Sequence, residues 1–220
     1  MKKLEKKDII ELILLIVILA FIFAIVLKTL VISSIIGKER KCEEIENVYE
    51  KISFENANNL KSYNIYKKND KVKTIIYTKR SGKITCYTEL NENSYSSFEG
   101  ETNKETEEYE GKIFDVTFNY FFADTIWDII NDALICKIGS ETTEEGIKCY
   151  VFENMYDKAK LKEEGIKNVK LYIDKSTGLP VQRVEENEDG SSNTIRFEFA
   201  FNTVTDRDVK RPVTSGPTER

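Results

Sequence analysis

Residues 171–183 have the sequence LYIDKSTGLPVQR. Two apolar stretches, 169–174 and 179–185, flank the polar tetrapeptide 175–178, which ends in Gly178. Glycine readily adopts the positive φ that tight turns between antiparallel strands require. The stretch therefore predicts a β-hairpin, and hairpins of this kind belong to antiparallel rather than parallel sheets.

Period-two patterns on both sides of this hairpin predict further strands. They cover residues 62–67, 72–78, 84–88, 95–98, 107–113, 135–140, 147–153 and 195–201. The acidic segment 100–108 is expected to be an exposed loop, and the charged segment 157–166 a short helix or loop. Residues 204–220 are polar and contain Pro212 and Pro217, so we expect a tail there.

Two segments instead show apolar residues at steps of three and four, which is typical of one face of a helix. The first starts at Cys42, continues through Ile45, Val48 and Ile52, and is expected to end near Asn58. The second covers 114–134, and its apolar stripe is so broad that a large surface of the protein must bury it. Together the segments predict an α+β domain. We expect a curved antiparallel sheet, an incomplete β-barrel, wrapping helices on its concave face.

The N-terminal segment is the most apolar part of the chain. From Ile9 to Leu27 the only polar residue is Glu11, and these residues would span about 28 Å as a helix, close to the thickness of a hydrocarbon core. A cleaved signal peptide is the alternative, but its apolar run would be shorter and a small-residue cleavage site would follow. We therefore expect a cytoplasmic tail (1–8), a transmembrane anchor (9–36), one extracytoplasmic domain (38–210) and a disordered tail (211–220).

The charges beside the anchor are nearly balanced. Four lysines precede it, and Lys28, Lys38, Arg40 and Lys41 lie at its other end. The short basic tail is typical of a signal anchor whose N-terminus stays inside. The expected location is therefore the cell membrane, with a single crossing and the soluble domain outside the cytoplasm.

Composition excludes several classes of function. The chain has 33 basic and 38 acidic residues, and omitting the first 37 residues, with five basic and three acidic side chains, leaves a net charge of −7. Such a charge disfavours nucleic acid as a partner. The chain has no histidine, which excludes histidine-dependent triads and histidine-ligated metals. We expect no cofactor, no metal and no catalytic residue, because carboxylate pairs such as Glu185-Glu186 arise by chance among so many acidic residues.

Three segments carry a family resemblance: 141–152 (ETTEEGIKCYVF), the hairpin 171–183, and 197–206 (FEFAFNTVTD). Together they resemble the LolA/LolB-like superfamily, with its LppX/LprG-like and RseB-type domains, in a membrane-anchored Gram-positive version. The resemblance implies an incomplete β-barrel whose concave side is filled by helices. It also implies binding of lipids or lipoprotein acyl chains, or a role as an envelope sensor. A tethered protein cannot shuttle across an envelope as the freely diffusing LolA does.

The expected function is a non-catalytic, membrane-anchored binding module for a lipid or lipoprotein acyl chain. Its groove would lie between the second helix and the sheet, with a wall formed by Phe118, Phe121, Phe122, Trp127 and Ile130. The alternative is that these residues pack as a dry core, and that the domain is an envelope sensor or protein-interaction module. The expected partners are thus the membrane, a lipid or acyl chain, and an envelope protein.

Two of the four cysteines form a candidate disulfide. If the turn between strands 135–140 and 147–153 is centred between Thr142 and Thr143, Cys136 lies directly opposite Cys149. Directly opposed residues of antiparallel strands are close enough for a disulfide. The alternative is a pair of reduced cysteines that serve as small strand residues.

Overall fold

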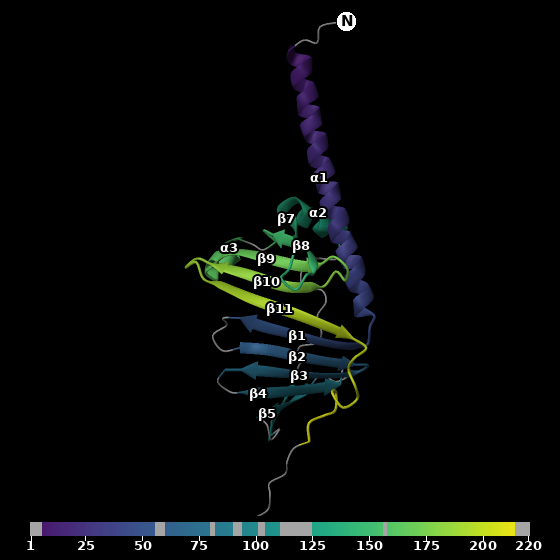
Figure 1. The fold of residues 1–220 in the computed structure, drawn as a ribbon, viewed down its shortest axis with the longest axis vertical. Helices are drawn as coiled ribbons and strands as arrows, with labels where there is room; N and C mark the ends of the chain where they lie inside the picture. Colours follow the sequence, from purple (N-terminus) through teal and green to yellow (C-terminus); the bar gives the residue numbers. More distant parts are fainter. Residues whose placement is uncertain are drawn as a thin grey trace, which may run out of the picture.

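The computed structural model describes residues 6–55, 60–79, 82–89, 94–100, 104–110, 125–155 and 158–213. Over these residues the elements, in chain order, are α1 (Lys6–Glu43), β1 (Asn47–Glu55), β2 (Leu60–Lys68), β3 (Lys71–Thr78), β4 (Lys83–Glu89), β5 (Ser94–Glu99), β6 (Lys104–Glu110), α2 (Ile126–Ile135), β7 (Lys137–Thr142), β8 (Lys148–Glu153), α3 (Lys158–Glu163), β9 (Ile166–Asp174), β10 (Pro180–Asn187) and β11 (Ser192–Phe201). Figure 1 shows their arrangement.

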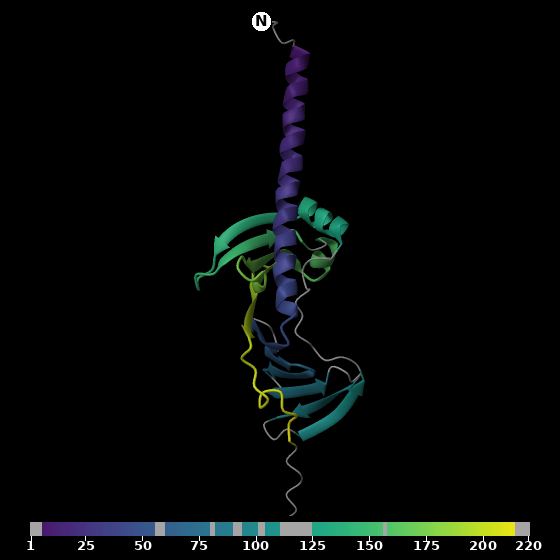
Figure 2. The same ribbon diagram turned by 90° about the vertical axis from the view of Figure 1, so that its right-hand side faces the viewer.

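Within the described residues the strands form one eleven-stranded sheet in the order β6-β5-β4-β3-β2-β1-β11-β10-β9-β8-β7. Two meanders, β1–β6 and β7–β11, join where β1 pairs with β11, with Val48 opposite Phe201. Figure 2 shows the sheet curling toward the side that carries the helices, without closing into a barrel. The predicted α+β class, with a curved antiparallel sheet beside an apolar N-terminal helix, is confirmed.

The sheet has two distinct faces, and successive side chains along each strand point to opposite faces. In β1, Val48, Ile52 and Phe54 point to the side that carries α1 and α2, which we call the helix face. Directly opposed residues of neighbouring strands point to the same face of the sheet. Phe54 lies opposite Ile195, Ile195 lies opposite Arg183, and Arg183 lies opposite Leu171. Leu171 packs in the same cluster as α1 and α2. The other side is the opposite face.

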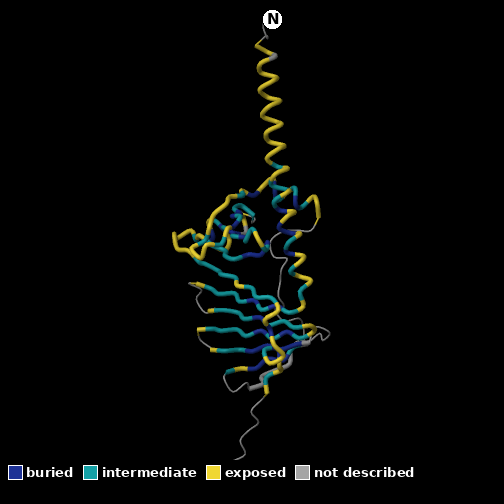
Figure 3. The backbone as a smooth tube through the Cα atoms, turned by 45° about the vertical axis from the view of Figure 1, so that its right-hand side comes forward, coloured by how far each residue is buried: buried dark blue, intermediate teal, exposed yellow. Residues whose placement is uncertain are grey.

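Helix α1 has an exposed part and a buried part. Its large apolar residues from Ile9 to Leu30 are mostly exposed, as the yellow part of the helix in Figure 3 shows. Beyond them Ile32, Ile35 and Ile36 are only 0, 1 and 5% exposed, and they share a core cluster with Phe152, Leu171 and Ile173 of the sheet. The final residues of the segment expected as anchor therefore belong to the core of the domain.

The β9–β10 turn, predicted from residues 175–178, is the point where the sheet meets α1. Gly178 has φ +78°, and a Cβ atom there would lie 2.8 Å from the carbonyl oxygen of Ile35 and 2.9 Å from the Cβ of Lys38. Lys38 Nζ donates to the carbonyl of Lys175. Glycine is thus required at residue 178 for two reasons, the positive φ and the close approach of α1.

The first predicted domain helix is wrong, because residues 47–55 form β1. Residues Val48, Ile52 and Phe54 also satisfy a period of two, and pairing with β2 on one side and β11 on the other selects the strand. Strand preference depends strongly on such neighbours. The actual helix, α1, ends at Glu43, and Cys42 and Ile45 pack against the cluster around Val48.

Further boundaries differ from the sequence predictions or lie outside the described residues. Helix α2 is described from Ile126 onward, and residues 114–124 of the predicted helix lie outside the described residues. Strand β6 occupies part of the segment 100–108 that was expected to be a loop. The segment after β11, expected to be a tail, packs on the opposite face, where Val204 and Val209 are 5 and 2% exposed.

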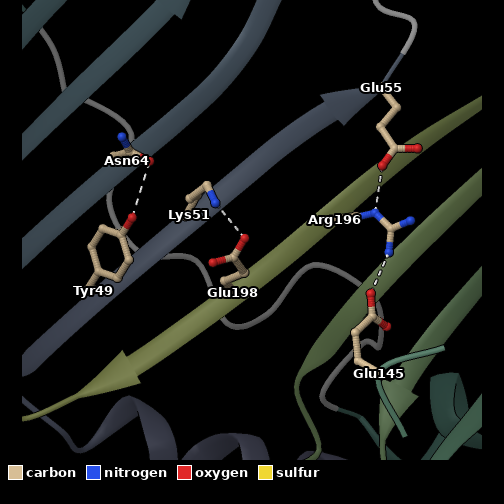
Figure 4. Close-up of polar contacts among 7 residues, drawn as sticks. All are labelled: Tyr49, Lys51, Glu55, Asn64, Glu145, Arg196 and Glu198. Carbon is tan, nitrogen blue, oxygen red and sulfur yellow. Dashed lines mark hydrogen bonds and ion pairs between the residues drawn. The ribbon is translucent and has the colours of Figure 1, made fainter. Parts of the chain in front are cut away.

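The opposite face carries polar cross-strand contacts (Figure 4). Lys51 Nζ lies 2.6 Å from Glu198 Oε1, and Arg196 forms ion pairs with Glu55 at 2.7 Å and Glu145 at 3.1 Å. Because these side chains are solvent-accessible, each pair stabilises the fold only slightly.

We expect Arg196→Gln to lower the free energy of unfolding by about 1 kcal/mol, since it removes two solvent-screened pairs. Urea titration of the full chain in detergent measures this change. Lys51→Gln, which removes one pair, is the control and should cost less. A loss above about 3 kcal/mol for Arg196→Gln would contradict the assignment of this face as solvated.

Candidate ligand-binding face

A half-buried group of apolar side chains lies on the helix face of the central strands. We call it the apolar patch, and it comprises Ile52, Phe54, Tyr63, Ile76, Ile195 and Phe197. Strand register makes the group contiguous, because Ile52 lies opposite both Tyr63 and Phe197. These side chains occupy alternate positions in their strands, so one face of four neighbouring strands is apolar and partly accessible.

Aromatic rings form one end of the patch. The rings of Phe54 and Tyr63 pack edge to face with their centroids 5.6 Å apart, a favourable geometry for aromatic pairs. Burial raises the pKa of the Tyr63 hydroxyl above its ordinary value. Tyr63 therefore stays neutral at physiological pH and presents an apolar ring with one polar group.

The inner end of the patch contains two buried polar side chains. Glu50 is 1% exposed and lies opposite Ile65 and Phe199 in the ladder, while Thr74 is 0% exposed opposite Ile65 in the next strand. A buried carboxylate on an apolar face is costly in itself. Both side chains have interaction partners within the protein and are covered by it, so they are not part of the accessible surface of the patch.

The neighbouring core closes the patch on the side toward α1. Val48, Ile65 and Val72 are 0, 2 and 0% exposed, and they pack with Leu179, the residue before β10. The helix face is therefore a closed core near α1 and a partly accessible surface farther along the strands.

Of the residues predicted to line the groove, the two that the structure describes, Trp127 and Ile130, are not part of the apolar patch. Trp127 is 73% exposed on α2, and Ile130 is half-buried. The α2 side chains that enter the core are Ile129 and Ala133. Phe118, Phe121 and Phe122 lie outside the described residues. Sequence reasoning missed the sheet residues, although the alternation of Ile195, Phe197, Phe199 and Phe201 marks one apolar face.

The register predicted for Cys136 and Cys149 is wrong. Cys149 lies opposite Glu141, and Cys136 caps the C-terminus of α2, one residue before β7 begins. The turn spans residues 143–147, with Gly146 at φ +83°, so it is centred later than Thr142-Thr143. The shift moves the two cysteines about five residues apart along the ladder, roughly 16 Å and far beyond disulfide reach. All four cysteines are free thiols.

We expect iodoacetamide to label Cys42 first and to leave Cys136 and Cys149 unmodified in the folded protein. The latter two are 1 and 0% exposed, whereas Cys42 is partly accessible. Burial, followed by the charge of Asp174, raises the pKa of Cys149 to about 11, so little reactive thiolate forms at neutral pH. Mass-spectrometric mapping checks the order, and a disulfide-linked 136–149 peptide in the folded chain would contradict the register.

Several acidic side chains of the C-terminal half have polar or charged partners within the chain. Glu185 lies 2.6 Å from Arg183, Asp206 lies 2.8 Å from Lys68, and Asp208 accepts hydrogen bonds from Thr205. In the turn after β10, Asp189 accepts from Ser191. Among the described residues no group of three or more metal-ligating side chains is arranged to hold an ion.

Comparisons with known proteins concern the fold. No family model and no curated protein matches the sequence. The structure resembles an uncharacterized conserved protein from Thermus thermophilus, with a TM-score of 0.50 and 13% identity over 83% of this chain and 94% of that one.

Two further solved structures resemble the chain more distantly. MucB has a TM-score of 0.48 and 12% identity over 83% of this chain and 63% of its own. The lipoprotein LppX from Mycobacterium tuberculosis has a TM-score of 0.44 and 9% identity over 80% of this chain and 96% of its own. At identities of 9–13% these similarities concern the backbone arrangement alone and say nothing of a ligand.

Proposed function

We propose that this chain is a non-catalytic binding module of the cell envelope, anchored by α1, with its domain outside the cytoplasm. The apolar patch would hold an acyl chain of a lipid or lipoprotein. The single observation that carries this proposal is the half-buried apolar surface on the helix face, next to a helix long and apolar enough to cross a membrane.

The anchor in this proposal comprises residues 9–30. These residues would span about 33 Å as a helix, which matches a hydrocarbon core of about 30 Å. Their apolar side chains are mostly exposed, whereas Ile32 and Ile35 are buried in the domain. Cleavage near residues 33–37 would cut through this packed part of the helix, so the structure favours an uncleaved anchor over a signal peptide.

The apolar patch fits one acyl chain better than a polar ligand. Each buried methylene group contributes about 0.8 kcal/mol to transfer from water, and aromatic and branched side chains provide the contact surface. Because the domain is tethered, its ligand would come from the membrane beside it.

Native mass spectrometry of the full chain, followed by lipid extraction, tests the proposal. We expect an apolar molecule to remain with the purified protein after detergent exchange. Phe54→Gln should lower its occupancy several-fold, since it places a polar amide in the patch. Tyr49→Gln is the matched control, because Tyr49 is half-buried in the same strand on the opposite face.

Two results would contradict the acyl-chain site. The first is that no apolar molecule co-purifies with the wild-type chain or binds when lipid is added. The second is equal occupancy in the Phe54→Gln and Tyr49→Gln variants. Either result would favour the sensor or protein-interaction alternative, in which the helix face is a dry core.

A further inference from the structure

Helix α2 exposes an unusual amount of apolar surface. Ile126, Trp127, Leu134 and Ile135 are 57, 73, 47 and 64% exposed. Ile126, Ile130 and Leu134 recur every four residues and form one stripe, with Trp127 beside it. Asp128 and Asn131 lie on another arc of the helix. Exposed apolar surface concentrated on one short helix indicates a binding surface rather than ordinary solvent contact.

Helix α2 is attached to α1 where the exposed part of α1 ends. Lys28 Nζ donates to the carbonyl of Cys136, the C-cap of α2, over 2.7 Å. Ile129 and Ala133 of α2 pack in the same cluster as Ile32 of α1. Figures 1 and 2 both show α2 beside α1, at the end of the domain from which the exposed part of α1 extends.

These contacts place α2 at the level where a membrane span over residues 9–30 would end. Leu27 and Leu30, near the end of that span, are 47 and 61% exposed, so α1 is still apolar and accessible at the level of α2. Lysine side chains at the ends of membrane helices direct their ammonium groups to the interface. Lys28 would do so here, and its hydrogen bond to Cys136 would then hold the C-terminus of α2 at that depth.

We propose that α2 lies in the headgroup region of the bilayer that α1 crosses. Trp127 and Leu134 would be inserted where the headgroups meet the acyl chains. The proposal rests on the membrane anchoring proposed above. Tryptophan suits this position, because its ring is apolar and its N–H can bond to water or headgroups. A single helix leaves the domain free to tilt, whereas a second contact restricts its orientation on the membrane.

The fluorescence of the protein tests this placement directly, because Trp127 is the only tryptophan in the chain. The full chain is reconstituted into phosphatidylcholine vesicles, and lipids brominated at different acyl positions are used as quenchers, with iodide in the aqueous phase. We expect a blue-shifted emission, strong quenching by lipids brominated near the glycerol end, and little quenching by iodide.

A relocated tryptophan provides the matched control. In Trp127→Phe/Lys79→Trp the single tryptophan follows β3, in the half of the sheet that lies away from α2 in Figure 1, and Lys79 is exposed. Its emission should be quenched by iodide and unaffected by brominated lipid. Equal fluorescence behaviour of Trp127 and the control would overturn the proposal, and so would a Trp127 shielded from both quenchers, which would indicate a protein cover.

Vesicle flotation separates this proposal from the one on which it rests. A chain that floats with the vesicles but shows iodide-accessible Trp127 is anchored by α1 without membrane contact by α2. A chain that does not float refutes the anchoring itself, and the interfacial placement of α2 with it.

Discussion

A fragment that begins at Lys38 will not fold, whereas a fragment that begins at Ile25 will. The first fragment lacks Ile32, Ile35 and Ile36, which are 0, 1 and 5% exposed in the core. Truncating one such side chain to alanine typically costs about 2–5 kcal/mol. Losing all three therefore removes at least about 6 kcal/mol, comparable with the whole stability of a typical domain.

Circular dichroism and urea unfolding of the two purified fragments measure the difference. Residues 25–220 should give a cooperative transition, because Ile25 and every core residue of α1 are retained. Residues 38–220 should lack one and should aggregate through the uncovered helix face. A cooperative transition of similar midpoint for both fragments would show that the domain does not need α1.

Gly178→Ala will destabilise the protein by about 2–5 kcal/mol. The left-handed conformation costs a residue with a Cβ about 1–2 kcal/mol, and overpacking against a rigid neighbour costs about 1–3 kcal/mol more. The neighbour here is rigid, because the new atom would lie 2.8 Å from the backbone oxygen of Ile35 in α1.

Gly190→Ala is the matched control for this substitution. Gly190 also has a positive φ, +84°, but a Cβ there meets nothing within 4 Å. It should cost only the conformational term, about 1–2 kcal/mol. Urea unfolding of both variants in detergent gives the comparison, and equal losses would show that α1 does not pack on the β9–β10 turn.

Local patterns were sufficient to predict much of the fold. The turn 175–178 and the alternating segments around it identified the antiparallel sheet, because hairpin chemistry and period-two burial act over a few residues. The apolar run from Ile9 identified the long helix. What local patterns missed was set by distant contacts: Ile32 and Ile35 resemble the rest of the apolar run, and only their packing on Phe152 and Leu171 makes them core.

Two errors concern the pairing of strands. Val48 and Ile52 fit both a helical and a strand period, and pairing with β11, distant in sequence, selects the strand. The β7–β8 register depends on where the turn lies, and a turn centred at Glu145 in place of one centred between Thr142 and Thr143 separates Cys136 from Cys149. The β1–β11 pairing cannot be read from a short window of sequence, whereas the hairpin register is set locally by the turn.

The predicted groove residues and the apolar patch come from different elements. An aromatic stripe at helical spacing drew attention to residues 114–134, yet Trp127 lies on the exposed side of α2. The apolar patch comes from alternate residues of four strands, which become neighbours only through the ladder. Its signal was present in residues 195–201, where Ile195 and the phenylalanines that follow occupy every second position.

The central claim is that α1 holds the domain against the outer surface of the membrane, and cysteine labelling in intact cells tests it most directly. In a Cys42→Ser background the three remaining native cysteines are buried. Glu188→Cys adds one accessible thiol in the exposed turn after β10. We predict that a membrane-impermeant maleimide labels this thiol equally before and after lysis. Labelling only after lysis would place the domain in the cytoplasm and contradict the account.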